Sequence, residues 1–431
     1  MKTNVSKLLS GRAMAVRIAI LALLVLGVGQ AQAQNQDPDE RIKAMEEQLK
    51  ELRDQLRQLR DGGGPDADDP FGGATLQSSS GMTLRFYGES KYNWTKGTSG
   101  NYFDPHRYVL MPAYQINDWI FFNSEVEIEH GGVDDKDNSR FRGALELEQF
   151  YADVKINDWL NWRSLGLSLI PVGSINLYHE PTLFYSVHRP IMYKYIIPST
   201  WMEGSTGFWG DTGVDGLSFE FLISSGIDNQ NGNIDDSKGV RNTRPNPNLK
   251  SGNRQLAYSF RLAYDGSSSG VDWLKGFSGS ASTYLGNYQE TTTTDTSAYL
   301  WDVEAKYRIQ SGALKNLEFI ADYAQWHFGS PDAIADANVG DSMYGYRLET
   351  AYHIPYGNAD AEIVPFFRYE GYDLSEGGKD ANAFTETGSN NYLTYGTAWF
   401  LNANMVLKAG VRQSLDDVDG TEFSIGVGYT F

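Results

Sequence analysis

The sequence predicts an all-β fold: a transmembrane antiparallel β-barrel of about sixteen strands, preceded by a short α-helical coiled coil. Three observations predict it. Segments beyond Gly81 alternate apolar and polar residues with a period of two. Tight turns alternate along the chain with long polar connections. In the last nine residues, every second position from Phe423 to Phe431 is bulky and apolar or aromatic, which is the pattern of a strand with one apolar face.

The first segment, residues 1-33, has the pattern of a cleaved secretory signal peptide. Its charges are all positive, residues 18–28 form an apolar run, and Ala31-Gln32-Ala33 has the small-x-small pattern of a cleavage site. The alternative is a membrane anchor, but a spanning helix needs roughly 20 apolar residues. We therefore expect cleavage after Ala33.

Residues 34-62 follow a heptad pattern that predicts a short periplasmic coiled coil. The alternative is a single amphipathic helix lying on a surface. Residues 63-81 are rich in Gly, Ser and Asp, which predicts a flexible acidic linker. The heptad positions, spaced three and four residues apart, are Ile42, Met45, Leu49, Leu52, Leu56 and Leu59.

Residues 82-431 consist of strand and turn patterns and are predicted to form the barrel. In the first strand Phe86 and Tyr92 share one face, while Arg85 and Glu89 share the other. Later segments repeat this division between an apolar face and a charged face. An apolar exterior with a charged interior is expected when lipid lies outside and water inside.

The connections predict the number of strands. Ile116-Asn117-Asp118-Trp119 recurs as Ile156-Asn157-Asp158-Trp159, where Asn-Asp is expected to form a turn and Trp to lie at the membrane interface. Seven such short turns and eight longer loops can be placed along the chain. They join sixteen strands, with both termini in the periplasm. The longest connection, about 172–204, is the third outer loop.

Composition excludes several classes of protein. The net charge is −19, and removal of the signal peptide with its four cations gives −23, which argues against a nucleic-acid partner. There is no cysteine, so disulfides and thiolate ligands are excluded. No second apolar run is long enough for a membrane helix, which excludes an inner-membrane transporter. His-Glu-x-x-His does not occur, and the one Gly-x-Ser-x-Gly match, Gly266-Ser267-Ser268-Ser269-Gly270, falls in a predicted turn and forms no nucleophile elbow. We therefore predict no catalytic residues, no cofactor and no metal site.

The third outer loop contains three distinctive motifs: His179-Glu180-Pro181, His188-Arg189-Pro190 and Ile197-Pro198-Ser199-Thr200-Trp201. Together with the layout of signal peptide, heptad segment, linker and sixteen-strand pattern, they resemble the phosphate-selective porin O/P family and its coiled-coil-bearing relatives. The resemblance implies a homotrimeric channel in the bacterial outer membrane. It also implies a constricting third loop and basic residues that guide small anions.

The third loop holds the candidate constriction residues. Arg189 and Lys194 could bind a phosphate or carboxylate by charge-assisted hydrogen bonds. Two histidines could add a dependence on pH. The alternative is that these residues attach the loop to the barrel wall, and we expect the dense aromatic residues nearby to pack the loop. The candidates are His179, Glu180, His188, Arg189, Lys194 and Glu203.

Strand parity also places a set of basic residues on the lumen face. Rings of Arg or Lys favour anions in pores. The same faces carry carboxylates, so the alternative is that the cations pair with acidic residues on neighbouring strands. The predicted basic column is Arg85, Lys91, Lys155, Arg261, Lys306, Arg308, Arg347, Arg368, Lys408 and Arg412.

Two functions fit these observations. The first is an outer-membrane porin for passive diffusion of small hydrophilic solutes, with anions preferred. The second is a structural barrel, tethered to the periplasm or cell wall through the coiled coil, with little or no conductance. In both, the barrel contacts outer-membrane lipid and is inserted by the barrel-assembly machinery. The predicted assembly signal is Phe423, Ile425, Val427, Tyr429 and Phe431.

Overall fold

The computed structural model describes most of the chain beyond the linker. The predicted signal peptide and coiled coil lie outside the described residues, as does most of the linker. None of the described helices is long and apolar enough to cross a membrane. The described residues are 76–77, 81–96, 101–131, 143–198, 200–229, 233–243, 255–289, 294–336, 339–357, 360–376, 389–416 and 420–431.

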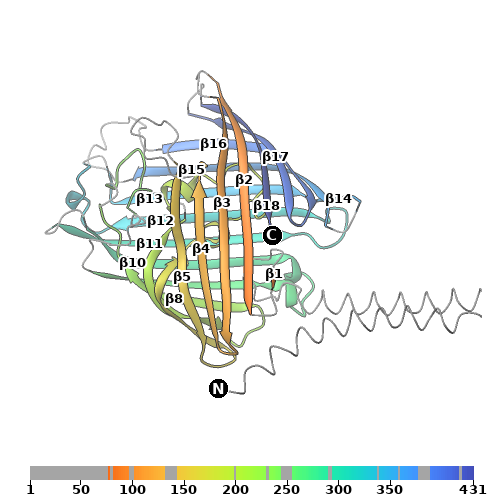
Figure 1. Ribbon diagram of the computed structural model, residues 1–431. Coiled ribbons are helices and arrows are strands. Elements are labelled where there is room, and N and C mark those ends of the chain that lie inside the picture. Colours follow the sequence, from red (N-terminus) through yellow and green to blue (C-terminus); the bar gives the residue numbers. More distant parts are fainter. Residues whose placement is uncertain are drawn as a thin grey trace, which may run out of the picture. The chain divides into compact units, whose positions relative to one another are not determined.

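Sixteen long strands form one antiparallel sheet within the described ranges (Figure 1). Each strand pairs with its neighbours in sequence, and β18 pairs with β2, which closes the sheet into a barrel. The predicted fold class and strand number are confirmed. The strands are β2 (Met82–Thr95), β3 (Tyr102–Asn117), β4 (Ile120–Glu129), β5 (Ala144–Lys155), β6 (Leu160–Leu169), β7 (Met202–Asp211), β8 (Leu217–Ser225), β9 (Leu256–Asp265), β10 (Phe277–Gln289), β11 (Asp295–Arg308), β12 (Leu317–Phe328), β13 (Ser342–Tyr352), β15 (Glu362–Glu376), β16 (Ser389–Asn402), β17 (Met405–Ser414) and β18 (Thr421–Thr430).

The remaining elements are short. Two-residue strands β1 (Leu76–Gln77) and β14 (Ile354–Pro355) pair with β2 and β15. Two single-turn helices, α3 (Ser174–Leu177) and α4 (Met192–Tyr195), lie in the connection between β6 and β7. The 3-10 turns η1 (Gly266–Ser268), η2 (Leu274–Gly276) and η3 (Pro331–Ala333) lie in other connections.

The alternation along β11 illustrates the two faces of the wall. Tyr299, Trp301 and Val303 are exposed on the outside, whereas Leu300 and Asp302, between them, are buried on the inside. A strand exposes alternate residues to opposite faces, so this order gives an apolar exterior and a more polar interior. The structure confirms the assignment of faces made from the sequence for this strand.

The recurring turns are built in the same way at both places. The side-chain oxygen of Asn117 accepts hydrogen bonds from the backbone N–H groups of Trp119 and Ile120, at 3.0 and 2.9 Å. The side chain of Asn157 does the same for Trp159 and Leu160, at 3.0 Å each. Asn stabilises tight turns by this type of bond, which is why the repeated sequence makes the same turn twice.

One feature of the wall departs from strict alternation. The pairing of β4 with β5 shifts register beside Glu125, where Gln149 pairs but Glu148 has no partner. This β-bulge leaves both Glu148 and Gln149 buried. Counting by twos from Gln149 would place Glu148 on the lipid face, so the sequence pattern alone misses a carboxyl group inside the barrel.

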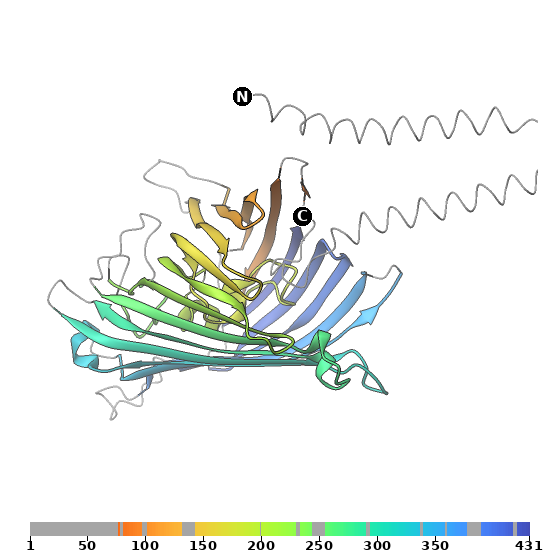
Figure 2. The same cartoon turned by 90° about the horizontal axis from the view of Figure 1, so that it is seen from below.

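The connection from β6 to β7, residues 170–201, folds against the inner wall. In the view from below, the yellow-green segments lie on the concave side of the curved sheet (Figure 2). We call residues 170–201 the inner loop. A buried apolar cluster joins it to the inner faces of strands β9 to β15.

Candidate functional site

The inner loop turns sharply at its start because of Gly173. This residue has φ of 75°, in the left-handed region that favours glycine. A Cβ atom here would lie 2.7 Å from both the Ile197 Cδ1 atom and the Tyr193 ring. Gly173 therefore allows the start and end of the inner loop to pack closely.

Hydrogen bonds attach the inner loop to side chains on several strands. The N–H of Ser174 donates to both oxygens of Glu304 on β11, at 2.8 and 2.9 Å. The N–H of Ile191 donates to Glu370 on β15, at 2.7 Å. In other places side chains of the wall donate hydrogen bonds to backbone carbonyl groups of the inner loop. These bonds run from Arg107 to His179 (2.6 Å), from Trp326 to Ile196 (2.7 Å) and from Lys408 to Ser186 (3.0 Å).

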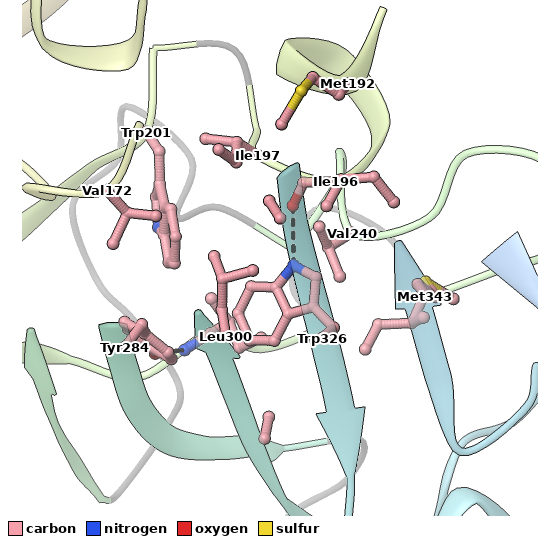
Figure 3. Close-up of a cluster of buried hydrophobic side chains, with 14 of the residues drawn as sticks. Val172, Met192, Ile196, Ile197, Trp201, Val240, Tyr284, Leu300, Trp326 and Met343 are labelled. Atoms are coloured by element: carbon pink, nitrogen blue, oxygen red, sulfur yellow. Dashed lines mark hydrogen bonds between the residues drawn. The ribbon is translucent and has the colours of Figure 1, made fainter. Parts of the chain in front are cut away.

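The apolar cluster packs side chains of the inner loop against side chains of β10, β11, β12 and β13 (Figure 3). Trp201 of the inner loop packs against Tyr284 and Trp326, with ring centroids 4.9 and 5.9 Å apart. Met192 and Ile196 from around α4 join the same cluster. The expectation that the loop aromatics pack the loop is confirmed for this tryptophan, which is fully buried.

The six candidate constriction residues fall into two groups. His179, Glu180 and Glu203 are buried. Glu203 lies at the start of β7 and accepts hydrogen bonds from Trp201 (3.0 Å) and Ser225 (2.6 Å). The other three, His188, Arg189 and Lys194, are half-buried in the inner loop.

Burial changes the protonation of two of these groups. It lowers the pKa of His179 to about 3, with the nearby Arg189 cation acting in the same direction. Burial likewise raises the pKa of Glu180 to about 8. His179 is therefore a neutral imidazole at neutral pH, and Glu180 holds a proton there for much of the time.

His188 is attached to the wall where β18 meets β2. Its Nε2 lies 2.8 Å from a Glu422 oxygen, 3.0 Å from the Asn93 oxygen and 3.2 Å from the Ser424 hydroxyl. Burial lowers its pKa to about 4, although the bond to Glu422 opposes this shift. The alternative role predicted for such residues, attachment of the loop to the wall, is the one these contacts support.

Most of the predicted basic column is paired with carboxylates. Arg347 binds Asp322 at 2.5 Å, and Arg368 binds Glu370 at 2.9 Å, all of them buried. Four more of the ten cations have an inner-wall partner: Arg261 with Glu304, Lys306 with Glu318, Arg308 with Glu318 and Glu362, and Arg412 with Glu422. Lys155 pairs instead with Asp158 in the adjoining turn.

Four cations around the lumen have no ion-pair partner within 4.0 Å among the described residues. Arg189 donates to the Thr200 hydroxyl at 3.3 Å, and Lys194 lies 5.0 Å from the centre of the Tyr195 ring. Lys408 is buried over Phe184, whereas Lys91 is half-buried and close enough to Arg189 for the two charges to interact. The four are Lys91, Arg189, Lys194 and Lys408.

The predicted assembly signal lies on the strand that closes the barrel. Phe431 exchanges two backbone hydrogen bonds of 2.7 Å with Phe86, and their rings stack with centroids 4.8 Å apart. Phe423 and Ile425 are exposed on the outer face. The contacts explain how the last residues complete the wall, and the role as an assembly signal stays a prediction.

Sequence reasoning missed several residues that organise the interior. Arg107 binds Glu89 at 2.8 Å, and Arg163 binds Asp153 at 3.1 Å and Glu220 at 2.7 Å. Both cations lie next to irregular pairing. Arg107 pairs with Glu89, beside the register shift between Glu89 and Lys91, and Arg163 directly precedes the shift between Arg163 and Gly166. Because a register shift interrupts the alternation of side chains, counting by twos from a neighbouring segment no longer predicts which face a residue occupies.

The sequence predicted no metal site, but two groups of potential ligands occur within the described ranges. Asp104, His106 and His130 lie together at one end of β3 and β4, where Asp104 bonds both histidines at 3.2 and 2.7 Å. The second group is buried and consists of Glu125, Glu148 and His179.

Comparisons with known proteins agree with this architecture. No protein-family model matches the chain, so the resemblance to phosphate-selective porins stays a prediction. An uncharacterized protein from Aquifex aeolicus (strain VF5) is 28% identical over 326 residues, which cover 72% of this chain and 71% of that protein.

Solved structures of outer-membrane proteins share the fold. The OmpF complex of Salmonella typhi with daunomycin has a TM-score of 0.55 at 17% identity, and covers 83% of this chain and 100% of its own. The outer membrane channel DcaP of Acinetobacter baumannii has a TM-score of 0.52 at 12% identity, and the match covers 83% of this chain and 100% of DcaP. The anion-selective porin from Comamonas acidovorans has a TM-score of 0.50 at 13% identity, and the match covers 81% of this chain and 99% of that porin. The chain therefore has the fold of outer-membrane porins.

Proposed function

We propose that this protein is an outer-membrane porin through which small hydrophilic solutes diffuse passively, without a catalytic step. The observation that carries the proposal is the closed barrel of sixteen long strands, counted within the described residues, with a charged inner face. Barrels of 16 to 18 strands enclose an aqueous channel, whereas eight-stranded barrels are filled by their own side chains. The inner loop, attached across the interior, would set the narrowest point.

Anion preference is part of the proposal. It is supported by the half-buried Lys91, Arg189 and Lys194, for which no carboxylate lies within ion-pairing distance in the described structure. The first two interact electrostatically with each other. Cations held close together attract a phosphate or carboxylate, and Glu89, which interacts with both Lys91 and Arg189, offsets part of this attraction. The paired cations elsewhere on the wall contribute little net field.

The setting of the channel completes the proposal. The barrel would lie in outer-membrane lipid, because its outer face exposes large apolar side chains such as Leu348, Phe367 and Ile425. We further propose insertion by the barrel-assembly machinery, a homotrimer, and a coiled coil over residues 34-62 in the periplasm. The exposed apolar residues around the wall offer surface for both lipid and neighbouring subunits.

The alternative function, a structural barrel with little or no conductance, is favoured by one observation. Arg368, Glu370 and Trp326 on the inner wall are fully buried, and the inner loop bonds two of them, Glu370 and Trp326. A loop that covers the wall so closely leaves less room for a pore. Liposome swelling separates the two functions. Vesicles that contain the protein should swell in arabinose and more slowly in larger sugars; no swelling in any of these solutes, with folded barrel present, would favour the structural function.

A further inference from the structure

Three potential metal ligands converge beneath the inner loop. Glu125 comes from β4, Glu148 from the bulge in β5, and His179 from the inner loop. One ligand atom from each lies within 4.8 Å of the others. The His179 Nε2 and a Glu148 oxygen are 3.9 Å apart, and all three side chains are buried.

Two of the three ligands, Glu148 and His179, have lone pairs that receive no hydrogen bond from an N–H or hydroxyl group. The Nδ1 of His179 lies 2.9 Å from the backbone oxygen of Asn176, so Nδ1 carries the proton and Nε2 presents a lone pair. This Nε2 has no hydrogen-bond partner, and neither oxygen of Glu148 receives a hydrogen bond from an N–H or hydroxyl group, although the Glu127 carboxyl group lies beside it. A buried acceptor without a donor is costly, and two acceptors that face each other repel. A cation between them would satisfy both.

The surrounding charges also leave a deficit of positive charge. Three carboxyl groups, Glu125, Glu127 and Glu148, interact here with two guanidinium groups, Arg107 and Arg189, so one carboxylate lacks a cationic counterpart. Glu127 lies next to Glu148, close enough for the two carboxyl groups to share a proton.

Neighbouring groups fix the orientation of two of the ligands. The Tyr87 hydroxyl donates to Glu125 at 2.9 Å, and Gln149 donates to its other oxygen. Asn176, which holds His179, is itself fixed by the backbone of Trp201, whose N–H donates to it at 2.7 Å. Such outer partners position and orient ligands in metal sites.

We propose that Glu125, Glu148 and His179 bind one divalent transition-metal ion, of which Zn²⁺ is the representative. Tetrahedral zinc with ligand distances of about 2.0 to 2.2 Å places two ligand atoms about 3.4 Å apart, so the 3.9 Å pair must close by about half an ångström. Small side-chain movements bring the third ligand into range. A mixture of imidazole and carboxylate suits zinc, whereas Ca²⁺ takes six to eight oxygen ligands. The ion would join the inner loop to the wall formed by β4 and β5.

The test begins with the metal content of the full-length protein. The protein is unfolded in denaturant with EDTA, refolded in detergent with or without ZnCl₂, desalted, and analysed by inductively coupled plasma mass spectrometry. We expect about one zinc ion per folded chain after refolding with zinc. Glu148→Gln and His179→Gln should each weaken zinc binding by about 100-fold or more, since each removes a ligand. Glu349→Gln, a buried carboxyl that binds Arg368 at 3.2 Å, is the matched control and should retain zinc.

If the ligand variants do not fold, X-ray absorption spectroscopy at the zinc edge identifies the zinc ligands in the wild-type protein. The proposed site predicts one imidazole and otherwise oxygen ligands. Two imidazoles would place the ion at Asp104, His106 and His130 and would overturn the proposal. The proposal would also be overturned if folded wild-type protein bound no zinc, or if both ligand variants bound zinc fully. In either case a proton shared between carboxyl groups would be left as the means of neutralising their charge.

Discussion

Arg107 on β3 donates a hydrogen bond of 2.6 Å to the backbone carbonyl of His179, and so connects the barrel wall to the middle of the inner loop. Its Nε binds Glu89 at 2.8 Å. One buried side chain thus holds a wall carboxylate and the loop at the same time. If the inner loop limits the pore, this residue contributes to both stability and conductance.

Arg107→Gln should therefore loosen the inner loop. Removal of one partner from a buried charge pair lowers the free energy of unfolding by about 3 kcal/mol. We expect lower urea stability, measured by the mobility of unheated samples in SDS gels, together with a larger single-channel conductance. Arg163→Gln is the matched control: it breaks pairs with Asp153 and Glu220 on the wall, so it should lower stability without enlarging conductance.

Lys91 and Arg189 should set the ion preference. Replacing each by Gln removes a half-buried cation that has no carboxylate partner among the described residues, so the ratio of chloride to potassium permeability should fall by about twofold or more. The measurement is the reversal potential under a KCl gradient. Lys275→Gln, in an exposed turn and paired with Asp272, should leave the reversal potential unchanged. An unchanged value in both lumen variants would contradict their role in selectivity.

His353, which follows β13, should make stability depend on pH. Burial lowers its pKa, but bonds to Glu318 and Glu362 outweigh this effect, so the pKa is raised above its usual value. The Tyr185 hydroxyl lies 3.1 Å from its Nε2, and Arg308 also contacts the ring. A raised pKa means that the folded state binds the proton on His353 more tightly than the unfolded state does. The stabilisation of the fold by this proton is therefore complete below the unfolded pKa of about 6.5.

This stabilisation should be lost as the pH rises through the folded pKa of His353. Urea unfolding at pH 5.5 and pH 8.5 measures the loss, and His353→Gln should remove this part of the pH dependence. His188→Gln is the comparison, because His188 has a lowered pKa and destabilises the fold only in acid. An identical pH dependence in wild type and His353→Gln would refute the assignment.

Phe431→Ala should weaken closure of the barrel. It removes the ring stacked on Phe86, and an aromatic pair contributes about 0.5 to 1.5 kcal/mol beyond its buried area. If the last strand is also an assembly signal, the yield of folded barrel in cells should fall more than the yield of refolding in detergent. Phe103→Ala, at an exposed position on β3, is the control. Equal losses in cells and in detergent would argue for a structural role alone.

The regular part of this fold was predictable because the two faces of the wall meet different media. Tyr299 and Trp301 face outward and Asp302 inward, as their alternation requires. The Asn117 and Asn157 turns were predictable because their bonds are local in sequence. The number of strands followed from counting these turns and the loops between them.

The interior was less predictable because its contacts join distant parts of the chain. Alternation along β11 places Glu304 on the inner face, but its bonds to Ser174 depend on the path of the inner loop. Glu148 reaches the interior through a bulge that no alternation reveals. Whether Arg347 and Arg368 are free or paired depends on the register between β12, β13 and β15, which the sequence does not specify.

The most direct test of the proposed channel is the current through single molecules of purified protein in a planar bilayer under a KCl gradient, with phosphate added in a second run. A porin with the proposed anion preference gives discrete conductance steps, a reversal potential on the anion side, and a current that phosphate reduces. A cation-side reversal potential would contradict the anion preference. Folded, inserted barrels that carry no current would contradict the central claim that this protein is a channel.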